Sequence, residues 1–173
     1  MNILTPPVSA DDHMQGRPDA ALVLVEFGDY ECPHCKAAYP VVKALQAELE
    51  DQLCFVYRHF PLMEIHPHAL AAAEAAEFAG AHGRFWPIHD VLFQNSPDLT
   101  YEDLATYVAS VDLDIQQFAH SLRTRRYLPR VQEHIESGLS SGVRGTPTFF
   151  INGTRHQGGY DLASLLEALR VAQ

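Results

Sequence analysis

The sequence has few cysteines, few basic residues and no long apolar run. Its 173 residues include 3 Cys, and 12 Lys and Arg stand against 22 Asp and Glu, for a net charge of -10 at pH 7. Three cysteines cannot build the disulfide framework that many small secreted folds need. The negative charge argues against nucleic acids and anionic membranes as partners. No segment reaches the roughly 18 apolar residues of a bilayer span, so we expect no membrane insertion.

The N-terminal segment has no feature of a signal peptide. Residues 1–16 contain no Lys or Arg and no apolar core. If Met1 is the native start, we expect a cytoplasmic protein, whereas removal of a leader would make it periplasmic. Residues 1–20 are rich in Pro, Asp and Gly, which predicts an irregular arm. Within this arm we expect residues 11–16 to form a turn with no chemical role.

Two of the three cysteines lie three residues apart, in Cys32-Pro33-His34-Cys35, directly after an apolar run at residues 22–27. This order predicts a buried strand followed by a helix whose first turn carries both thiols. Positions i and i+3 share a helix face, so the two sulfurs can form a disulfide with little backbone movement. Pro33 suits the first helical position, because its missing N–H would have no intrahelical partner there.

The predicted helix start should lower the pKa of Cys32. Free backbone N–H groups and the helix dipole stabilise a thiolate, which is the species that attacks and leaves in disulfide exchange. A protonated His34 would add to this effect. Asp29 and Glu31 place two carboxylates near Cys32 and should oppose it, because like charges raise the pKa of a thiol.

Two other interpretations of the Cys-x-x-Cys pair remain open. Such a pair is half of a zinc site, although a structural zinc normally needs a second pair of ligands, and Cys54 is isolated in an apolar segment. The pair could also be inert and structural. Seven histidines in or near the middle of the chain have irregular spacing, and no carboxylate or thiol pair completes a ligand set, so we predict no metal site among them. They are His59, His66, His68, His82, His89, His120 and His134.

The order of the remaining elements predicts an α/β fold. The run at residues 22–27, the helix after Cys35 and a second apolar run at residues 53–57 form a parallel β-α-β unit. Residues 61–142 have the apolar spacing of about five helices. Asn152-Gly153 between two extended runs predicts a hairpin, and Asp161 is a good N-cap for a final helix.

This arrangement resembles the DsbA-like family of thiol-disulfide oxidoreductases, from about residue 20 to the end. The matching residues are Cys32-Pro33-His34-Cys35, then Lys36 and Pro40 along the helix, and Gly145-Thr146-Pro147-Thr148 before the hairpin. The resemblance implies a thioredoxin-like fold with an inserted all-helical domain. Residues 1–20 would be an N-terminal arm, residues 21–60 and 143–173 the thioredoxin-like domain, and residues 61–142 the helical insertion.

The same resemblance implies roles for three further residues. The Thr146-Pro147 peptide bond should be cis and lie beside the redox pair, where both residues would bind substrate. Glu26 interrupts an apolar strand at a cost unless something uses or satisfies its carboxylate. Burial should raise its pKa, and the resemblance implies that it exchanges a proton with Cys35. A purely structural Glu26 stays open.

The implied function is disulfide exchange with protein or peptide substrates through Cys32 and Cys35, with no cofactor and with an unidentified redox partner. Acidic residues before Cys32, and Thr146 before the proline, depart from DsbA itself, so the oxidase, reductase and isomerase directions stay open. Two alternatives remain: a non-enzymatic peptide-binding or chaperone module, and a metal-binding Cys-x-x-Cys protein. The mechanism expects the Cys32 sulfur to be exposed at the helix tip.

Overall fold

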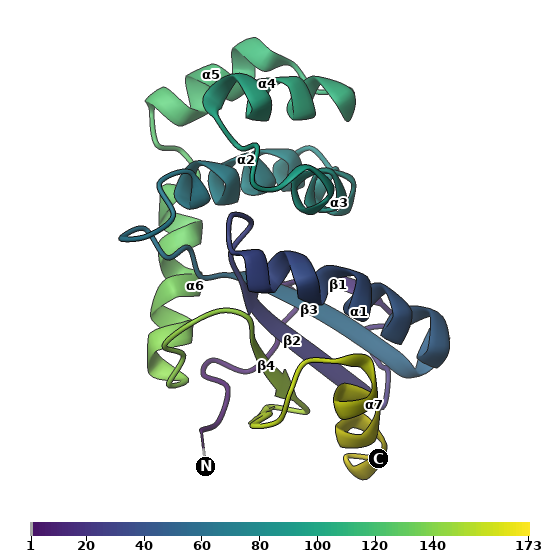
Figure 1. The fold of residues 1–173 in the computed structure, drawn as a ribbon. Helices are drawn as coiled ribbons and strands as arrows, with labels where there is room; N and C mark the ends of the chain where they lie inside the picture. Colours follow the sequence, from purple (N-terminus) through teal and green to yellow (C-terminus); the bar gives the residue numbers. More distant parts are fainter. Residues whose placement is uncertain (1) are drawn as a thin grey trace.

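The computed structural model describes residues 2–173, in which one mixed sheet adjoins a group of helices (Figure 1). The strand order is β1-β3-β2-β4-β5. Strands β2 and β3 are parallel, and the other neighbours are antiparallel. The strands are β1 (His13–Gly16), β2 (Leu22–Gly28), β3 (Leu53–His59), β4 (Thr148–Ile151) and β5 (Thr154–Arg155). The helices are α1 (Pro33–Leu49), α2 (Ala69–Ala81), α3 (Phe85–Asn95), α4 (Tyr101–Ser110), α5 (Ile115–Arg123), α6 (Leu128–Ser140) and α7 (Leu162–Val171), with a 3-10 turn η1 (Glu50–Gln52) after α1.

The predicted parallel unit is confirmed as β2-α1-β3. Successive side chains of β2 point to opposite faces of the sheet. Leu22 and Leu24 pack in one core with the buried face of α1, whereas Val25 and Phe27 pack in a second core on the other face. Glu26 follows the alternation and therefore faces α1.

The helices between β3 and β4 form one end of the molecule. Figure 1 shows α2, α3, α4 and α5 gathered there, while α6 runs from this end back along the sheet. Most residues of the alanine-rich helix α2 are buried, because their small side chains let the neighbouring helices approach closely. The core of this end is continuous with the core between the sheet and α1. The division into separate domains at residues 61 and 142 stays a prediction.

The prediction of an irregular N-terminal arm was wrong in one part. Residues 13–16 form β1, which pairs antiparallel with the outer edge of β3 in the register His13 to Tyr57. Ile3 forms an isolated antiparallel bridge with Thr154 of β5. The same segment thus contacts both edges of the sheet. The short strand was missed because its stability comes from the partner strand and not from its own residues.

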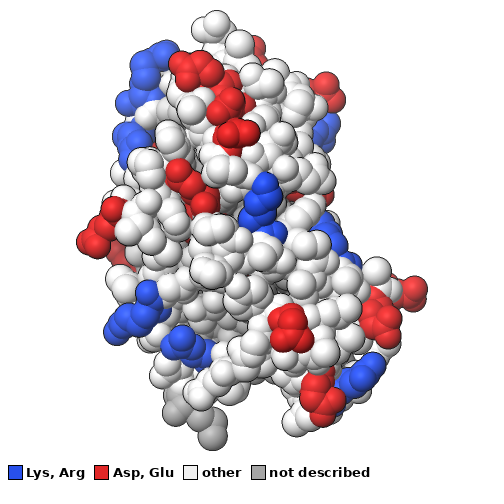
Figure 2. All heavy atoms as spheres, in the orientation of Figure 1, with Lys and Arg blue, Asp and Glu red and all other residues white. Residues whose placement is uncertain are grey.

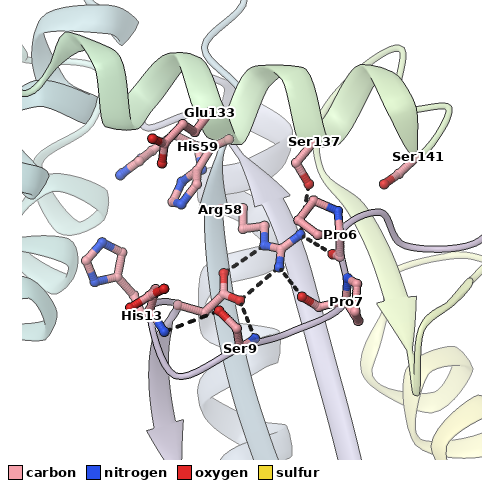
Figure 3. A network of polar contacts seen from close by, with 12 residues as sticks. Pro6, Pro7, Ser9, His13, Arg58, His59, Glu133, Ser137 and Ser141 are labelled. Atoms are coloured by element: carbon pink, nitrogen blue, oxygen red, sulfur yellow. Dashed lines mark hydrogen bonds and ion pairs between the residues drawn. The ribbon is translucent and has the colours of Figure 1, made fainter.

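The expected turn at residues 11–16 also contains a buried ion pair (Figure 3). The guanidinium of Arg58 donates to both carboxylate oxygens of Asp12, each at 2.8 Å. It also donates to the Pro6 carbonyl at 2.9 Å and to the Ser137 hydroxyl at 2.8 Å. Burial alone would raise the pKa of Asp12, but hydrogen bonds from Arg58 and the Ser9 amide, together with the charges of Arg58 and Arg130, outweigh it and lower that pKa. The network fixes the arm between β3 and α6.

The end of the chain follows the predicted pattern. Asn152 and Gly153 have positive φ values of 47° and 81°, which suits the tight turn between β4 and β5. The extended run after the turn is short, since strand β5 ends at Arg155. Asp161 caps α7 by accepting a hydrogen bond from the Ser164 amide at 3.0 Å.

Two features concern the nucleic-acid and membrane partners that the sequence argues against: the distribution of charge on the surface and the apolar length of the helices. On the face drawn in Figure 2, basic and acidic side chains lie in small separate groups. Across residues 2–173, no helix combines the length and the apolar character required to cross a bilayer.

Candidate active site

The pair of cysteines lies where β2 leads into α1. Cys32 is the N-cap residue of α1 and Pro33 is the first helical residue, as predicted. The Cys32 amide donates to the Asp29 carbonyl and to its carboxylate oxygen Oδ1, each at 3.1 Å. These bonds hold the turn before the helix, so that the amides of His34 and Cys35 are directed at the Cys32 sulfur.

The surroundings of Cys32 favour its thiolate. Hydrogen bonding from the Cys35 thiol is the largest influence, and together with the Thr146 side chain and the amides of Cys35 and His34 it outweighs the opposing effect of burial. These contacts lower the pKa of Cys32 from 9.0 to about 5. The predicted direction is confirmed, and the helix start contributes to it as expected.

Cys35 has the opposite character. Burial raises its pKa well above the ordinary thiol value, and the neighbouring Cys32 and the carboxylate of Glu26 raise it further. At neutral pH the reduced pair therefore contains one thiolate, on Cys32, and one thiol, on Cys35. The third cysteine lies on the other face of the sheet, since Cys54 packs with Val25 and Val56.

The expectation that the Cys32 sulfur is exposed was wrong. Only 3% of the residue is accessible. The loop before β4 covers it, and the protonated Cys32 thiol donates to the Thr146 carbonyl at a sulfur-to-oxygen distance of 3.6 Å. The Thr146-Pro147 peptide bond is cis. The Thr146 hydroxyl is buried and has no hydrogen-bond partner among residues 2–173.

Glu26 lies under α1 and is almost fully buried, with 2% of the residue accessible. Within residues 2–173, its Oε1 atom has no hydrogen-bond partner. Burial, followed by the charge of Cys32, raises the pKa of Glu26 from 4.5 to about 8. The predicted direction is confirmed, and the carboxyl group is protonated at neutral pH.

The two carboxylates before Cys32 have partners of their own. Asp29 accepts hydrogen bonds from the Leu62 amide at 2.9 Å and from His66 at 2.8 Å, in addition to the amide of Cys32. Glu31 accepts from the amide and from the ring of His68, at 2.7 and 2.9 Å. The pKa of Cys32 is lowered despite these two nearby groups, whose carboxylates accept hydrogen bonds from the segment after β3.

Two hollows lie next to the loop that covers Cys32. One, of about 390 Å³, is lined by Pro147, Gln157 and Tyr160 among others, and the exposed His34 ring lies at 3.0 Å from the Tyr160 hydroxyl. The other, of about 500 Å³, is mostly apolar. Its lining includes Met63, Ile65 and Leu139, of which 53%, 68% and 51% are exposed.

The structure also reveals a polar cluster that the sequence did not predict. His13 and His59 both contact Oε1 of Glu77 through their Nε2 atoms, at 2.7 and 2.9 Å. The expectation that no carboxylate completes a set with the histidines was therefore wrong. A glutamate among the alanines of a buried helix was the available signal. By contrast, within residues 2–173 no third ligand atom joins Cys32 and Cys35.

Paired thiols at the start of the first helix of a β-α-β unit, next to a cis-proline loop, define the class of thioredoxin-fold proteins. The chain matches the family described as Thioredoxin over residues 9–170 and belongs to it.

Two solved structures show the same architecture. Oxidised BdbD from Bacillus subtilis is 22% identical, with a TM-score of 0.85 over 93% of this chain and 92% of that one. A thioredoxin-like oxidoreductase from Silicibacter pomeroyi is 26% identical, with a TM-score of 0.80 over 95% and 93% of the two chains. The DsbA-like fold predicted from the sequence, a thioredoxin fold with inserted helices, is confirmed.

Curated relatives are much longer than this chain. The Na(+)/H(+) antiporter NhaA 1 of Salinispora arenicola is 42% identical over 167 residues, which make up 96% of this chain and 26% of the antiporter. The chain thus spans about a quarter of the length of the curated relatives it matches.

Proposed function

We propose that this chain is a thiol-disulfide oxidoreductase that exchanges disulfides with protein substrates through Cys32 and Cys35. The observation that carries the proposal is the difference between the two thiols within one helical turn: the pKa of Cys32 is lowered to about 5 and that of Cys35 is raised well above its ordinary value. A good leaving thiolate and a protonated resolving thiol are what two-step exchange needs.

In the proposed reaction a substrate thiolate attacks the Cys32 sulfur of the oxidised pair. The bond between Cys32 and Cys35 breaks, and the Cys35 sulfur takes a proton, which we assign to Glu26 because that acid is protonated at neutral pH and influences the charge of Cys35. A second substrate thiolate then attacks the substrate sulfur of the mixed disulfide, and Cys32 leaves as thiolate. The substrate is oxidised by two electrons and the pair is reduced.

We assign the pair the direction of a disulfide donor. A lowered pKa stabilises the reduced form through its thiolate, and this makes the disulfide form the stronger oxidant. An unidentified partner must then remove the two electrons from the reduced pair to complete a cycle.

The substrate segment is proposed to lie against Thr146 and Pro147 in an extended conformation, with backbone hydrogen bonds of the strand-addition kind. The apolar hollow containing Met63 and Ile65 would receive its side chains, because it adjoins the same loop. Because Cys32 is buried, substrate binding has to move the Thr146 carbonyl aside before the sulfur can be attacked.

Equilibration in graded glutathione buffers, followed by alkylation of free thiols, tests the direction. We expect the midpoint to lie at a more oxidising ratio than that of the cytosol, about -220 to -260 mV by extraction, which would suit a periplasmic location. A more reducing midpoint would overturn the donor assignment and favour a reductase in the cytoplasm.

Substitutions test the chemistry itself. Cys32→Ser should reduce exchange with a model disulfide to the uncatalysed rate, and Cys35→Ser should accumulate mixed disulfides with substrates. Cys54→Ser is the matched control and should keep full activity, since this thiol lies on the opposite face of the sheet. If Cys32→Ser/Cys35→Ser still acts fully on unfolded substrates, the protein is a binding module and not an oxidoreductase.

A further inference from the structure

A second polar site lies where the arm, the sheet and the helical part of the chain meet. His13 is on β1, His59 ends β3 and Glu77 is on α2. In the register of the sheet His13 is opposite Tyr57, and His59 is two residues further along β3. Side chains two residues apart share a face, so both imidazoles project to the same side, where α2 supplies the carboxylate.

The three side chains converge on one small volume. The Glu77 Oε1 atom is 2.7 Å from Nε2 of His13 and 2.9 Å from Nε2 of His59, and the ligand atoms all lie within 4.8 Å of one another. The side chains of Glu77 and His59 are 7% and 1% exposed, whereas that of His13 is 17% exposed. The His13 ring is therefore the side from which a small ion could enter.

The carboxylate of Glu77 is negatively charged, and among residues 2–173 no Lys or Arg side chain pairs with it. Its partners are the two imidazoles. A buried carboxylate needs a positive partner, because burial without one is costly. Either a protonated imidazole or a bound cation can supply it.

A third imidazole, that of His134, adds an independent observation. His134 on α6 is 3% exposed, and its Nδ1 accepts the His59 amide at 3.0 Å. Its Nε2 therefore carries the ring proton, yet this buried atom has no hydrogen-bond partner in the described part of the chain, residues 2–173. The ring stacks on His59 with centroids 5.2 Å apart and meets His13 edge-on at 6.2 Å. A donor without an acceptor beside the cluster suits a further ligand, such as a water molecule.

We propose that His13, His59 and Glu77 bind a divalent transition-metal ion, with zinc the best match. Two imidazole nitrogens and one carboxylate oxygen are ligands that zinc takes at about 2.0–2.2 Å, and a water molecule can complete a four-coordinate site. On binding, the ion takes the place of the Nε2 proton of each ring; a neutral ring then carries its proton at Nδ1, and any second proton passes to the solvent. The Nδ1 atom of His59 has no hydrogen-bond partner among residues 2–173. The ion joins the arm and α2 to the sheet. Figure 3 shows His13 and His59 beside the Arg58 network that fixes the same arm.

Thiolates are good zinc ligands in general, so the test uses a chain without a polyhistidine tag that carries Cys32→Ser and Cys35→Ser. Zinc is titrated against a chromophoric chelator. We expect one equivalent to bind, and the unfolding midpoint to rise by about 5 °C at a zinc concentration of 100 times the dissociation constant. Cobalt should give visible absorption without a sulfur charge-transfer band, because the three ligands contain no thiolate.

Variants of the cluster locate the ion. His13→Ala and Glu77→Gln should each weaken zinc binding at least tenfold, whereas His120→Ala, at an exposed position on α5, should leave it unchanged. If His13→Ala does not fold, Glu77→Gln decides, because it keeps the volume of the side chain. Undiminished binding in Glu77→Gln, or no binding at micromolar zinc in the parent chain, would overturn the proposal.

Discussion

Glu26 on β2 and Glu77 on α2 are both almost fully buried, with 2% and 6% of the residue exposed, respectively. The groups that surround their carboxyl groups differ. The Oε1 atom of Glu26 has no hydrogen-bond partner among the described residues. Burial, followed by the charge of Cys32, raises the pKa of Glu26 to about 8. Burial also opposes the ionisation of Glu77, but two imidazoles donate to it and hold its pKa far below the ordinary value.

Burial and hydrogen bonding thus have separate effects on whether a buried carboxyl group is ionised. Two groups of the same type at similar depth hold a proton in one case and a negative charge in the other, because only one has donors that favour the ionised form. Glu26, the protonated acid, lies near the two thiols, where the proposed reaction needs a proton. The ionised acid joins three segments of the chain. Stability measurements on one variant of each residue can test this contrast.

The largest effect on stability is expected from Glu26→Gln. The folded pKa is raised, so the carboxyl group favours folding fully below about pH 4.5 and loses that contribution as the pH rises to about 8. At pH 7 Glu26 is ionised in the unfolded chain but protonated in the folded one, and this difference destabilises the natural protein. The glutamine variant has no such group and should be more stable than the natural chain by about 3 kcal/mol. Urea unfolding of the reduced proteins at pH 5 and pH 8 measures the difference.

Cys32 titrates in both chains, and its charge is one cause of the raised pKa of Glu26, so the difference between the chains includes this coupling. A difference that does not grow between pH 5 and pH 8 would show that Glu26 ionises normally in the folded protein, and its assignment as a proton donor would fail with it.

Glu77→Gln should change stability in the opposite sense. The folded pKa of Glu77 is lowered, so its contribution is present above the unfolded value of about 4.5 and is lost as the pH falls below it. In a buffer with a metal chelator at pH 7, we expect a loss of about 1–3 kcal/mol, because the amide replaces a charged acceptor of two hydrogen bonds.

Glu48→Gln at an exposed position on α1 is the matched control and should fall within about 0.5 kcal/mol of the natural chain. If the effect of Glu77→Gln were the same at pH 3 and pH 7, the carboxylate charge would not be the source of its stability.

The smallest effect is expected where a similar contact lies at the surface. Tyr160→Phe removes the contact with His34 at 3.0 Å, but water replaces the lost partner, so we expect a change within about 0.5 kcal/mol. Thermal unfolding measures it. A loss above about 1 kcal/mol would mean that surface contacts matter as much as the buried ones, and the comparison would lose its basis.

The predictions that succeeded depend on neighbours in the sequence. Pro33 starting a helix, Asn152-Gly153 in a hairpin turn and Asp161 capping α7 are all determined within a few residues. The raised pKa of Glu26 was predictable because the whole run around it is apolar.

The features that were missed depend on partners far away in the chain. Strand β1 needs the edge of β3, and Glu77 meets His13 across 64 residues. The burial of Cys32 was missed for the same reason, since Thr146 covers it from 114 residues away. Local patterns carry no information about which of many polar residues the fold will bring together.

The crossing of residues 3–16 from β5 to β3 has a consequence for solubility. Unpaired strand edges are templates for intermolecular pairing. Because Ile3 bridges β5 at one border of the sheet and β1 covers β3 at the other, this one segment shields both borders. Detachment of this segment would expose two unpaired strand edges at once. A chain that lacks the first 16 residues would therefore be prone to aggregate through either edge.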